Sequence, residues 1–489
     1  MTTRSLAAST VDDAHGWTSR TWLLLVVLCG ALFLDGLDIS MVGVALPSIG
    51  GDLGMSPSAL QWIVSGYVLG YGGLLLLGGR SADLLGRRQV FLTAVAVFGI
   101  ASVVSATLSS PEAIIALRFV KGVAAAFTVP AGLSIITTTF SEGPARNRAL
   151  SIYTVVGASG FSLGLVFGGA LTEVGWRATF LLPGPVALLL LAIGSRVVPA
   201  SVRSVSRLAE FDLAGALTST AALLSLVVAV VEAPTHGWGS GTVLGLLALA
   251  LVLTAAFVVT ELRHPTPLVR LGILRSVHLV HANLAGAIMA GGYFSFQFLA
   301  TLYLQDSLGW SPMAMALGFL PAGLLVIASS TRIDRVLARV STQALIAVGL
   351  SSFLVAYVLF LRVDPGLGYA ALLLPTMILL GVGFATAFPS INVQATAGVA
   401  DHEQGLASGL VNTSVQIGGA VVLAVISAIL ANHATGAPVH DEVIPGMLGG
   451  LRVIVGLTVV GVLASLAMLL RRTAPEPAYE EIDEVELAA

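Results

Sequence analysis

The chain has 489 residues, of which 56% are hydrophobic and 10% charged, and its mean hydropathy is +0.96. A soluble fold of this length cannot bury so much apolar surface, so the composition excludes a soluble protein and predicts an all-α, polytopic membrane protein. The formal net charge of -3 indicates no particular partner, and we expect a lipid bilayer and no nucleic acid.

Fourteen windows are apolar and long enough to cross about 30 Å of hydrocarbon, which takes about 20 helical residues. They lie near residues 22–46, 59–79, 89–109, 112–136, 149–171, 178–198, 212–232, 242–261, 279–304, 312–330, 342–361, 369–392, 405–431 and 450–470. The first window is too long for the core of a signal peptide, so we expect it to be retained. The single cysteine, Cys29, lies in it, which excludes a disulfide within one chain.

Arginines alternate between the two sets of loops. Eighteen of them fall in alternate loops or at the two ends of the chain, whereas the opposite loops hold only Arg177, Arg362 and Arg452. Short cytoplasmic loops carry the excess of positive residues. The pattern therefore supports 14 spans and predicts that both termini are cytoplasmic in a multi-pass protein of the cell membrane.

Four ionisable side chains lie inside the first and fourth windows. Asp35 and Asp38 are three residues apart and share one helix face, as do Arg118 and Lys121. A carboxylate near the bilayer centre costs about 2.5–3.5 kcal/mol, so we expect each acid to be neutralised by a cation. Because the two helices run in opposite directions, the spacing predicts two rungs, Asp38 with Arg118 and Asp35 with Lys121.

The loop GGRSADLLGRR, residues 78–88, joins the second and third windows. Gly79 and Gly86 permit a tight reversal, and Asp83 can pair with Arg87, Arg88 or a helix N-terminus. A similar stretch, TRIDRVLAR, occurs at residues 331–339 and indicates a duplicated bundle.

The duplication predicts five regions. They are a cytoplasmic segment at 1–21, an N-terminal six-helix bundle at 22–198, a linker with two inserted helices at 199–270, a C-terminal six-helix bundle at 271–471 and a disordered acidic tail at 472–489.

The loop at 78–88 closely resembles the signature loop of the major facilitator superfamily, Gly-x-x-x-Asp-x-x-Gly-Arg-Arg. DISMVGVALP at 38–47, QWIVSGYVLG at 61–70, RFVKG at 118–122 and GLVNTSVQIGG at 409–419 resemble motifs of its fourteen-helix drug:proton antiporter branch, with Ser40 and Lys121 in place of the usual Thr and Gln. The resemblance implies the major facilitator fold and export of drug-like molecules. It also implies a conformational gate that comprises Gly79, Asp83, Gly86, Arg87 and Arg88.

The fifth window departs from the antiporter motif of that branch, Gly-x-x-x-Gly-Pro-x-x-Gly-Gly. Gly160, Gly164, Gly168 and Gly169 are present, but Leu165 stands at the proline position. The glycines also permit close helix packing without any role in antiport. Proton-coupled symport, or facilitated passage of a small organic metabolite, therefore stays open as an alternative to antiport.

The energy source follows from what the motifs exclude. Lys121 is the only lysine and no P-loop surrounds it, so the chain does not hydrolyse ATP by that route. We find no nucleophile–base pair or metal cluster, so we expect no enzyme activity. We interpret His278 and His281 as residues at the membrane interface and expect no metal site. We expect no cofactor, and a proton gradient as the energy source.

The membrane charges are candidates for proton coupling. We hypothesise that a proton on Asp38, or on the coupled pair Asp35 and Asp38, releases Arg118 and favours one facing of the transporter. Lys121 would balance the second acid. The alternative is a purely structural ladder of salt bridges.

Candidate substrate contacts are aromatic and amide side chains in windows that the resemblance places around a central cavity. They are Tyr67, Tyr71, Phe127, Tyr293, Gln297, Asn412 and Gln416. These groups suit an amphipathic, aromatic molecule, although packing in the bundle or against lipid is the commoner fate of such residues. We expect the protein to function as a monomer.

Overall fold

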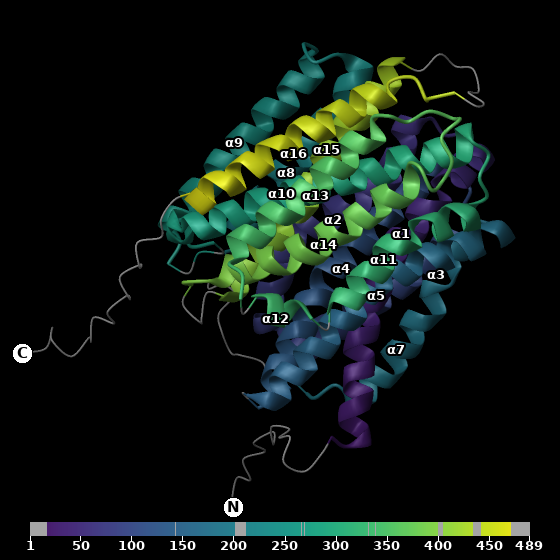
Figure 1. Cartoon of the computed structure of the whole chain (residues 1–489). Coiled ribbons are helices and arrows are strands. Elements are labelled where there is room, and N and C mark those ends of the chain that lie inside the picture. Colours follow the sequence, from purple (N-terminus) through teal and green to yellow (C-terminus); the bar gives the residue numbers. More distant parts are fainter. Residues whose placement is uncertain are drawn as a thin grey trace, which may run out of the picture.

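A computed structural model describes residues 17–470 except 142, 201–211, 266, 268, 331, 338, 400–403 and 434–441. The described chain is a bundle of long helices (Figure 1). The predicted acidic tail and most of the predicted N-terminal segment lie outside these residues. The helices of the N-terminal part are α1 (Ser19–Leu53), α2 (Pro57–Leu85), α3 (Arg87–Thr107), α4 (Pro111–Thr139), α5 (Pro144–Val174), α6 (Arg177–Leu181) and α7 (Pro183–Val197).

The remaining helices follow in the same order as the predicted windows. They are α8 (Leu213–His236), α9 (Gly241–Arg263), α10 (Val277–Leu302), α11 (Pro312–Ser330), α12 (Ile333–Leu337), α13 (Thr342–Phe360), α14 (Leu373–Thr396), α15 (Gln404–His433) and α16 (Met447–Leu470), with a 3-10 turn at Leu271–Arg275 and a π-helical turn at Tyr303–Ser307. Each of the 14 predicted windows overlaps a described helix, and α6 with α7 forms one window. Among the described residues, 13 helical segments are long and apolar enough to cross a membrane, and α2 adds a further helix of 29 residues.

Local sequence explains where many helices begin. Ser56, Ser110, Ser240, Ser276 and Ser341 each stand directly before a helix, and each side chain accepts a hydrogen bond from the backbone N–H three residues on. Proline follows the first two of these serines, where its missing N–H costs no helical hydrogen bond.

The helices form an N-terminal half, α1 to α7, and a C-terminal half, α10 to α16, which lie side by side in Figure 1. Within the halves the closest packing joins α1 with α5, α2 with α4, α10 with α15 and α13 with α14. The inserted helices α8 and α9 pack against each other, and α8 also packs against α2 and α15. This arrangement agrees with two bundles and an insert, whose predicted boundaries remain predictions.

Glycines bring α1 against α5 and α2 against α4 at backbone distance. A Cβ atom on Gly160 of α5 would lie 2.4 Å from the carbonyl oxygen of Phe33 on α1. A Cβ atom on Gly122 of α4 would lie 2.0 Å from the carbonyl oxygen of Tyr67 on α2. No side chain larger than hydrogen fits there, so the predicted close packing around Gly160 is confirmed. We call these two units the α1–α5 pair and the α2–α4 pair.

Each pair also packs against the C-terminal half. Gly72 of the α2–α4 pair lies against Gln416 of α15, where a Cβ atom would be 2.7 Å from the Gln416 Cβ. Gly169 of the α1–α5 pair lies against α11, where a Cβ atom would be 2.9 Å from the Met313 Cα. We call these contacts the α2–α15 seam and the α5–α11 seam.

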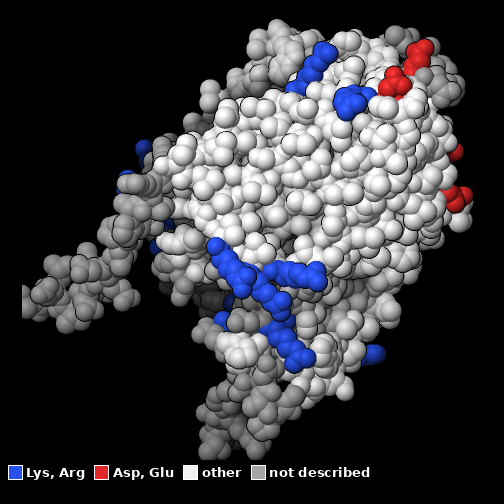
Figure 2. Space-filling model, in the orientation of Figure 1, with Lys and Arg blue, Asp and Glu red and all other residues white. Residues whose placement is uncertain are grey.

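Charged side chains mark the two ends of the bundle. The end at which α2 stops and α3 begins carries Arg80, Arg87 and Arg88, and we call it the arginine-rich end and the opposite end the far end. Figure 2 shows a cluster of basic side chains separated by a broad uncharged band from a smaller group that includes both signs. This band is the surface expected of a protein that lies in a bilayer.

The two halves are joined between the middle of the bundle and the far end. Gln305, in the π-helical turn after α10, donates a hydrogen bond of 2.9 Å to the Val44 carbonyl of α1. Ser311 donates one of 2.9 Å to Glu173 at the end of α5. The larger hydrophobic core is continuous across both halves here, whereas a second core occupies mainly the arginine-rich part of the N-terminal half.

Candidate functional site

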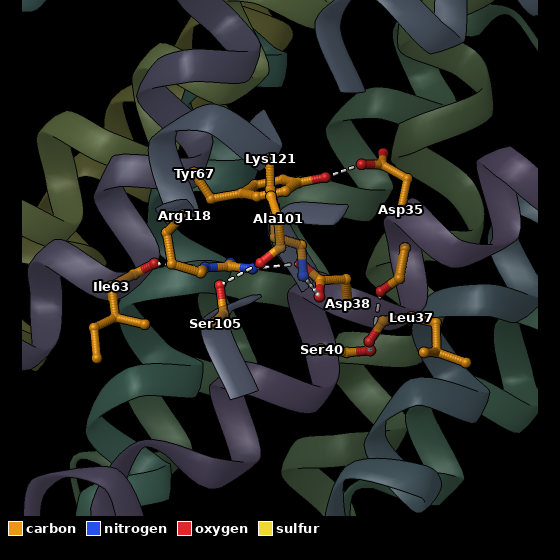
Figure 3. A network of polar contacts seen from close by, with 11 residues as sticks. Asp35, Leu37, Asp38, Ser40, Ile63, Tyr67, Ala101, Ser105, Arg118 and Lys121 are labelled. Atoms are coloured by element: carbon orange, nitrogen blue, oxygen red, sulfur yellow. Dashed lines mark hydrogen bonds and ion pairs between the residues drawn. The ribbon is translucent and has the colours of Figure 1, made fainter. Parts of the chain in front are cut away.

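Five polar side chains from three helices meet inside the N-terminal half (Figure 3). Asp35 and Asp38 come from α1, Tyr67 from α2, and Arg118 and Lys121 from α4. We call them the polar cluster. Asp38, Tyr67 and Lys121 are 0% exposed, Arg118 is 1% exposed and Asp35 is 8% exposed.

Asp38 is the centre of the polar cluster because it forms ion pairs with two cations. One carboxylate oxygen accepts a hydrogen bond from Arg118 and the other accepts one from Lys121. Arg118 also donates through Nε to the Ile63 carbonyl of α2, at 2.9 Å. Charge-assisted bonds of this kind are among the strongest hydrogen bonds in proteins. The predicted pair of Asp38 with Arg118 is confirmed.

The predicted rung of Asp35 with Lys121 is wrong. Asp35 instead accepts a hydrogen bond from the Tyr67 hydroxyl, and Lys121 turns to Asp38. Figure 3 shows the Tyr67 side chain reaching across to Asp35. Two physical reasons explain the difference. Asp38 has two oxygens and so accommodates both cations, and the long flexible lysine stem spans the turn that separates the expected partners.

Aromatic rings surround the two cations. The Arg118 guanidinium lies over the Tyr67 ring, 4.4 Å from its centroid. The Lys121 ammonium lies 4.8 Å from the centroid of Phe98 on α3 and 5.6 Å from that of Phe180 on α6. These faces attract a cation without adding charge. Tyr67 therefore contacts a cation with its ring and a carboxylate with its hydroxyl.

A small cavity adjoins Asp35. Its volume is about 20 Å³, enough for about one water molecule. The lining residues come from α1, α3, α4 and α7: Ala31, Leu34, Asp35, Val95, Phe98, Ala125, Thr128 and Ala187.

The predicted gate loop is mostly helical. α2 continues through Gly79 to Leu85, so the prediction that Gly79 makes the reversal is wrong. The reversal occurs at Gly86, whose φ of 97° suits glycine, and α3 begins at Arg87. Arg88 donates a hydrogen bond to the Ser195 carbonyl near the end of α7. The side chain of Asp83 lies outside the described residues, so its gate role remains a prediction.

Tyr293 occupies an aromatic cluster between the halves. Its ring centroid lies 5.9 Å from that of Phe161 on α5 and 5.8 Å from that of Phe384 on α14. Phe384 in turn stacks on Phe388 at 5.3 Å. We did not predict these three phenylalanines, although FATAF at 384–388 places two aromatic residues one helical turn apart. Tyr293 thus links a C-terminal helix to the N-terminal half.

The other predicted substrate contacts are dispersed. Gln297 is buried next to α1, where a Cβ atom on Gly43 would be 3.2 Å from its amide nitrogen. Gln416 is buried in the α2–α15 seam, and Asn412 donates to the Ser408 carbonyl at 3.0 Å. Tyr71 is buried against Tyr67.

Phe127 lies elsewhere, in an apolar groove of about 690 Å³ formed by the end of α2 together with α3 and α4. The substrate-binding roles of these residues therefore remain predictions.

His281 lies inside the C-terminal half, in a hydrogen-bonded network that the sequence did not indicate. Its ring nitrogens lie 2.9 Å from the Ser465 hydroxyl of α16 and 2.7 Å from the Gln394 amide nitrogen of α14. The Gln394 amide also donates to the His278 carbonyl at 3.0 Å. This network satisfies polar groups where α10, α14 and α16 converge.

A bundle of two helical halves with membrane-length apolar helices, and with paired charges buried in one half, is typical of a membrane transporter. The sequence matches the family model of the Major Facilitator Superfamily over residues 28–423. The chain belongs to the Major Facilitator Superfamily.

Relatives and solved structures agree with this assignment. The chain is 36% identical to the puromycin resistance protein pur8 of Streptomyces alboniger. The match extends over 486 residues and covers 96% of this chain and 95% of that protein. It is 35% identical to the cephamycin export protein CmcT of Amycolatopsis lactamdurans, over 86% of this chain and 87% of the relative. A crystal structure of a peptide transporter POT in complex with sulfate matches with a TM-score of 0.70 at 17% identity, over 95% of this chain and 96% of that one. The last likeness shows the fold alone.

Proposed function

We propose that the protein exports drug-like or antibiotic small molecules across the cell membrane in exchange for protons. Resistance and export proteins are similar to this chain over most of their length, which supports the direction and the substrate class. The observation that carries proton coupling is the coupled pair of buried membrane carboxylates, Asp35 and Asp38, of which Asp38 has no exposed surface and lies between two cations. Intramembrane ionisable groups of this kind mark ion and proton pathways.

The structure supports a proposed conformational state. The α5–α11 seam and the hydrogen bonds Gln305–Val44 and Ser311–Glu173 join the halves toward the far end, and the α2–α15 seam joins them near the middle of α2. The positive-inside rule supports a cytoplasmic location for the arginine-rich end. We propose that the described conformation is closed on the outer side, and that export requires both seams to loosen.

The proposed exchange has a direct test in reconstituted vesicles. In these vesicles the cytoplasmic side of the transporter faces outward and the lumen is made acidic. The resulting proton gradient should drive accumulation of puromycin in the lumen, and an uncoupler should abolish that accumulation. A symporter would accumulate substrate only under the opposite gradient, and a facilitator would not accumulate it at all. Either of these results would replace antiport by symport or facilitated passage, the alternatives that the missing proline at Leu165 leaves open. α5 runs unbroken through Leu165.

Tyr293 should contribute to recognition of aromatic substrates. We expect Tyr293→Ala to raise the KM for puromycin about tenfold, because it would lose a ring contact with the aromatic substrate. Such a contact is worth about 0.5–1.5 kcal/mol beyond burial. Tyr293→Phe keeps the ring and should stay within about threefold of the wild type. Initial transport rates over a range of puromycin concentrations measure both, and an unchanged KM in Tyr293→Ala would remove this residue from the binding site.

A further inference from the structure

The polar cluster joins two units that otherwise meet only sparsely. Far fewer residues are in contact between α1 and α2, or between α1 and α4, than within the α1–α5 pair or the α2–α4 pair. The links across this boundary that involve a carboxylate are Asp38 with Arg118, Asp38 with Lys121, and Asp35 with Tyr67, and the Tyr153 hydroxyl of α5 also donates to the Val129 carbonyl of α4. Their arrangement therefore affects how one pair sits relative to the other.

The position of the pairs matters because each pair carries one seam with the C-terminal half. The α2–α4 pair carries the α2–α15 seam through Gly72, and the α1–α5 pair carries the α5–α11 seam through Gly169. Glycine contacts at Gly122 and Gly160 hold the two helices of each pair at backbone distance, which favours movement of each pair as a unit. A change in a link between the pairs consequently displaces one seam relative to the other.

The three carboxylate links respond differently to a proton. A proton on Asp38 would leave two buried cations facing a neutral group, which is costly. A proton on Asp35 alters one hydrogen bond, which comes from the neutral Tyr67 hydroxyl, and leaves both cations in their ion pairs with Asp38. The cavity beside Asp35 holds room for the water that delivers the proton. Asp35 is thus the acid at which protonation disturbs the fewest contacts.

The surroundings of Asp35 contain other titratable or charged groups on three further helices. They are Asp38 on α1, Tyr67 and Tyr71 on α2, Arg118 and Lys121 on α4, and Tyr153 on α5. From α3 and α7, the side chains that line the adjacent cavity are Val95, Phe98 and Ala187, which are apolar.

We infer that the hydrogen bond from Tyr67 to Asp35 is a proton-sensitive link that holds the α1–α5 pair and the α2–α4 pair together while Asp35 is ionised. A hydrogen bond to a carboxylate is roughly twice as strong as one to a neutral carboxyl group. When Asp35 takes up a proton from the acidic solution by relay through a water molecule, which is left neutral, the tyrosine keeps its own proton, the bond weakens and the pairs shift. Tyr67 is a positioning residue in this scheme, which rests on the proton antiport proposed above.

The link also accounts for tight coupling. An antiporter wastes its gradient if the empty, unprotonated protein changes its facing. The ionised Asp35 and Tyr67 hold the far end closed in that state, and a proton or a substrate is needed to release it.

A spin-label pair at the far end tests the link. Val174 at the end of α5 is exposed, as is Arg362 after α13, and the native Cys29 is replaced by alanine to leave only the introduced cysteines. Pulsed EPR distances between Val174→Cys and Arg362→Cys report the ratio of closed to open far end. We call the protein with these three substitutions the parent. In the parent we expect the fraction of molecules with a closed far end to fall as the pH is lowered.

Tyr67→Phe removes the hydroxyl but keeps the ring beneath Arg118. We expect its closed-to-open ratio at high pH to drop at least about tenfold, to the low-pH value of the parent, with little remaining pH response. Tyr153→Phe is the matched control, because its buried hydroxyl donates to the Val129 carbonyl at 3.3 Å. The control should keep the parent's pH response.

Two results would overturn the inference: a Tyr67→Phe variant with the parent's pH response, or a Tyr153→Phe variant that loses it equally. If Tyr67→Phe does not fold, Asp35→Asn serves in its place. We expect this variant to have the parent's low-pH ratio of closed to open far end at every pH. A pH response like that of the parent would also overturn the inference. Vesicle transport by the parent separates this failure from a failure of antiport. A parent that moves puromycin on a proton gradient, with Tyr67→Phe behaving normally, refutes the link alone.

Discussion

Replacing Asp38 with asparagine is expected to abolish proton-driven export and to destabilise the fold more than any other single change in the polar cluster. The variant leaves Arg118 and Lys121 buried without the carboxylate that pairs with both. Removing one partner of a buried ion pair typically costs about 3–5 kcal/mol. Transport in vesicles and thermal denaturation of the purified protein measure the two effects.

A double-mutant cycle identifies the partner of Lys121. We expect Lys121→Gln to recover much of the stability lost in Asp38→Asn, because it removes a buried ammonium that has lost its direct ion-pair partner. It should restore little of the stability lost in Asp35→Asn, since Asp35 bonds to Tyr67. Stronger coupling of Lys121 with Asp35 than with Asp38 would contradict the observed geometry.

Gly122→Ala is expected to have the second large effect. The added Cβ would lie 2.0 Å from the Tyr67 carbonyl oxygen and 2.8 Å from its carbon, both backbone atoms that no side-chain rotation moves. α2 and α4 must therefore separate, which costs about 1–3 kcal/mol or more and displaces Tyr67 from Asp35. Thermal denaturation and the yield of monodisperse protein measure the loss.

Gly456→Ala on α16 is the matched control for Gly122→Ala. A Cβ at Gly456 meets nothing within 4 Å, so the variant should have wild-type stability or slightly more. Equal losses at both positions would mean that the cost comes from glycine replacement in general and not from the α2–α4 contact.

The pair of Asp38 with Arg118 was predictable because spacing along two antiparallel helices limits which residues share a face and a depth. The partners of Asp35 and Lys121 were not predictable in the same way. They depend on a third helix, since Tyr67 of α2 reaches Asp35, and on side-chain reach, since Lys121 spans a helical turn to Asp38. The aromatic cluster around Tyr293 likewise joins residues from distant segments.

Hydropathy, arginine placement and short motifs suffice for the membrane class, the order of the helices and the superfamily, because the bilayer imposes helix length and loop charge on each segment separately. The contacts of Gly72 with Gln416 and of Gly169 with α11, and the use of Gly86 rather than Gly79 for the reversal, emerge from packing between segments. Such contacts depend on the relative rotation and depth of whole helices, which no local pattern encodes.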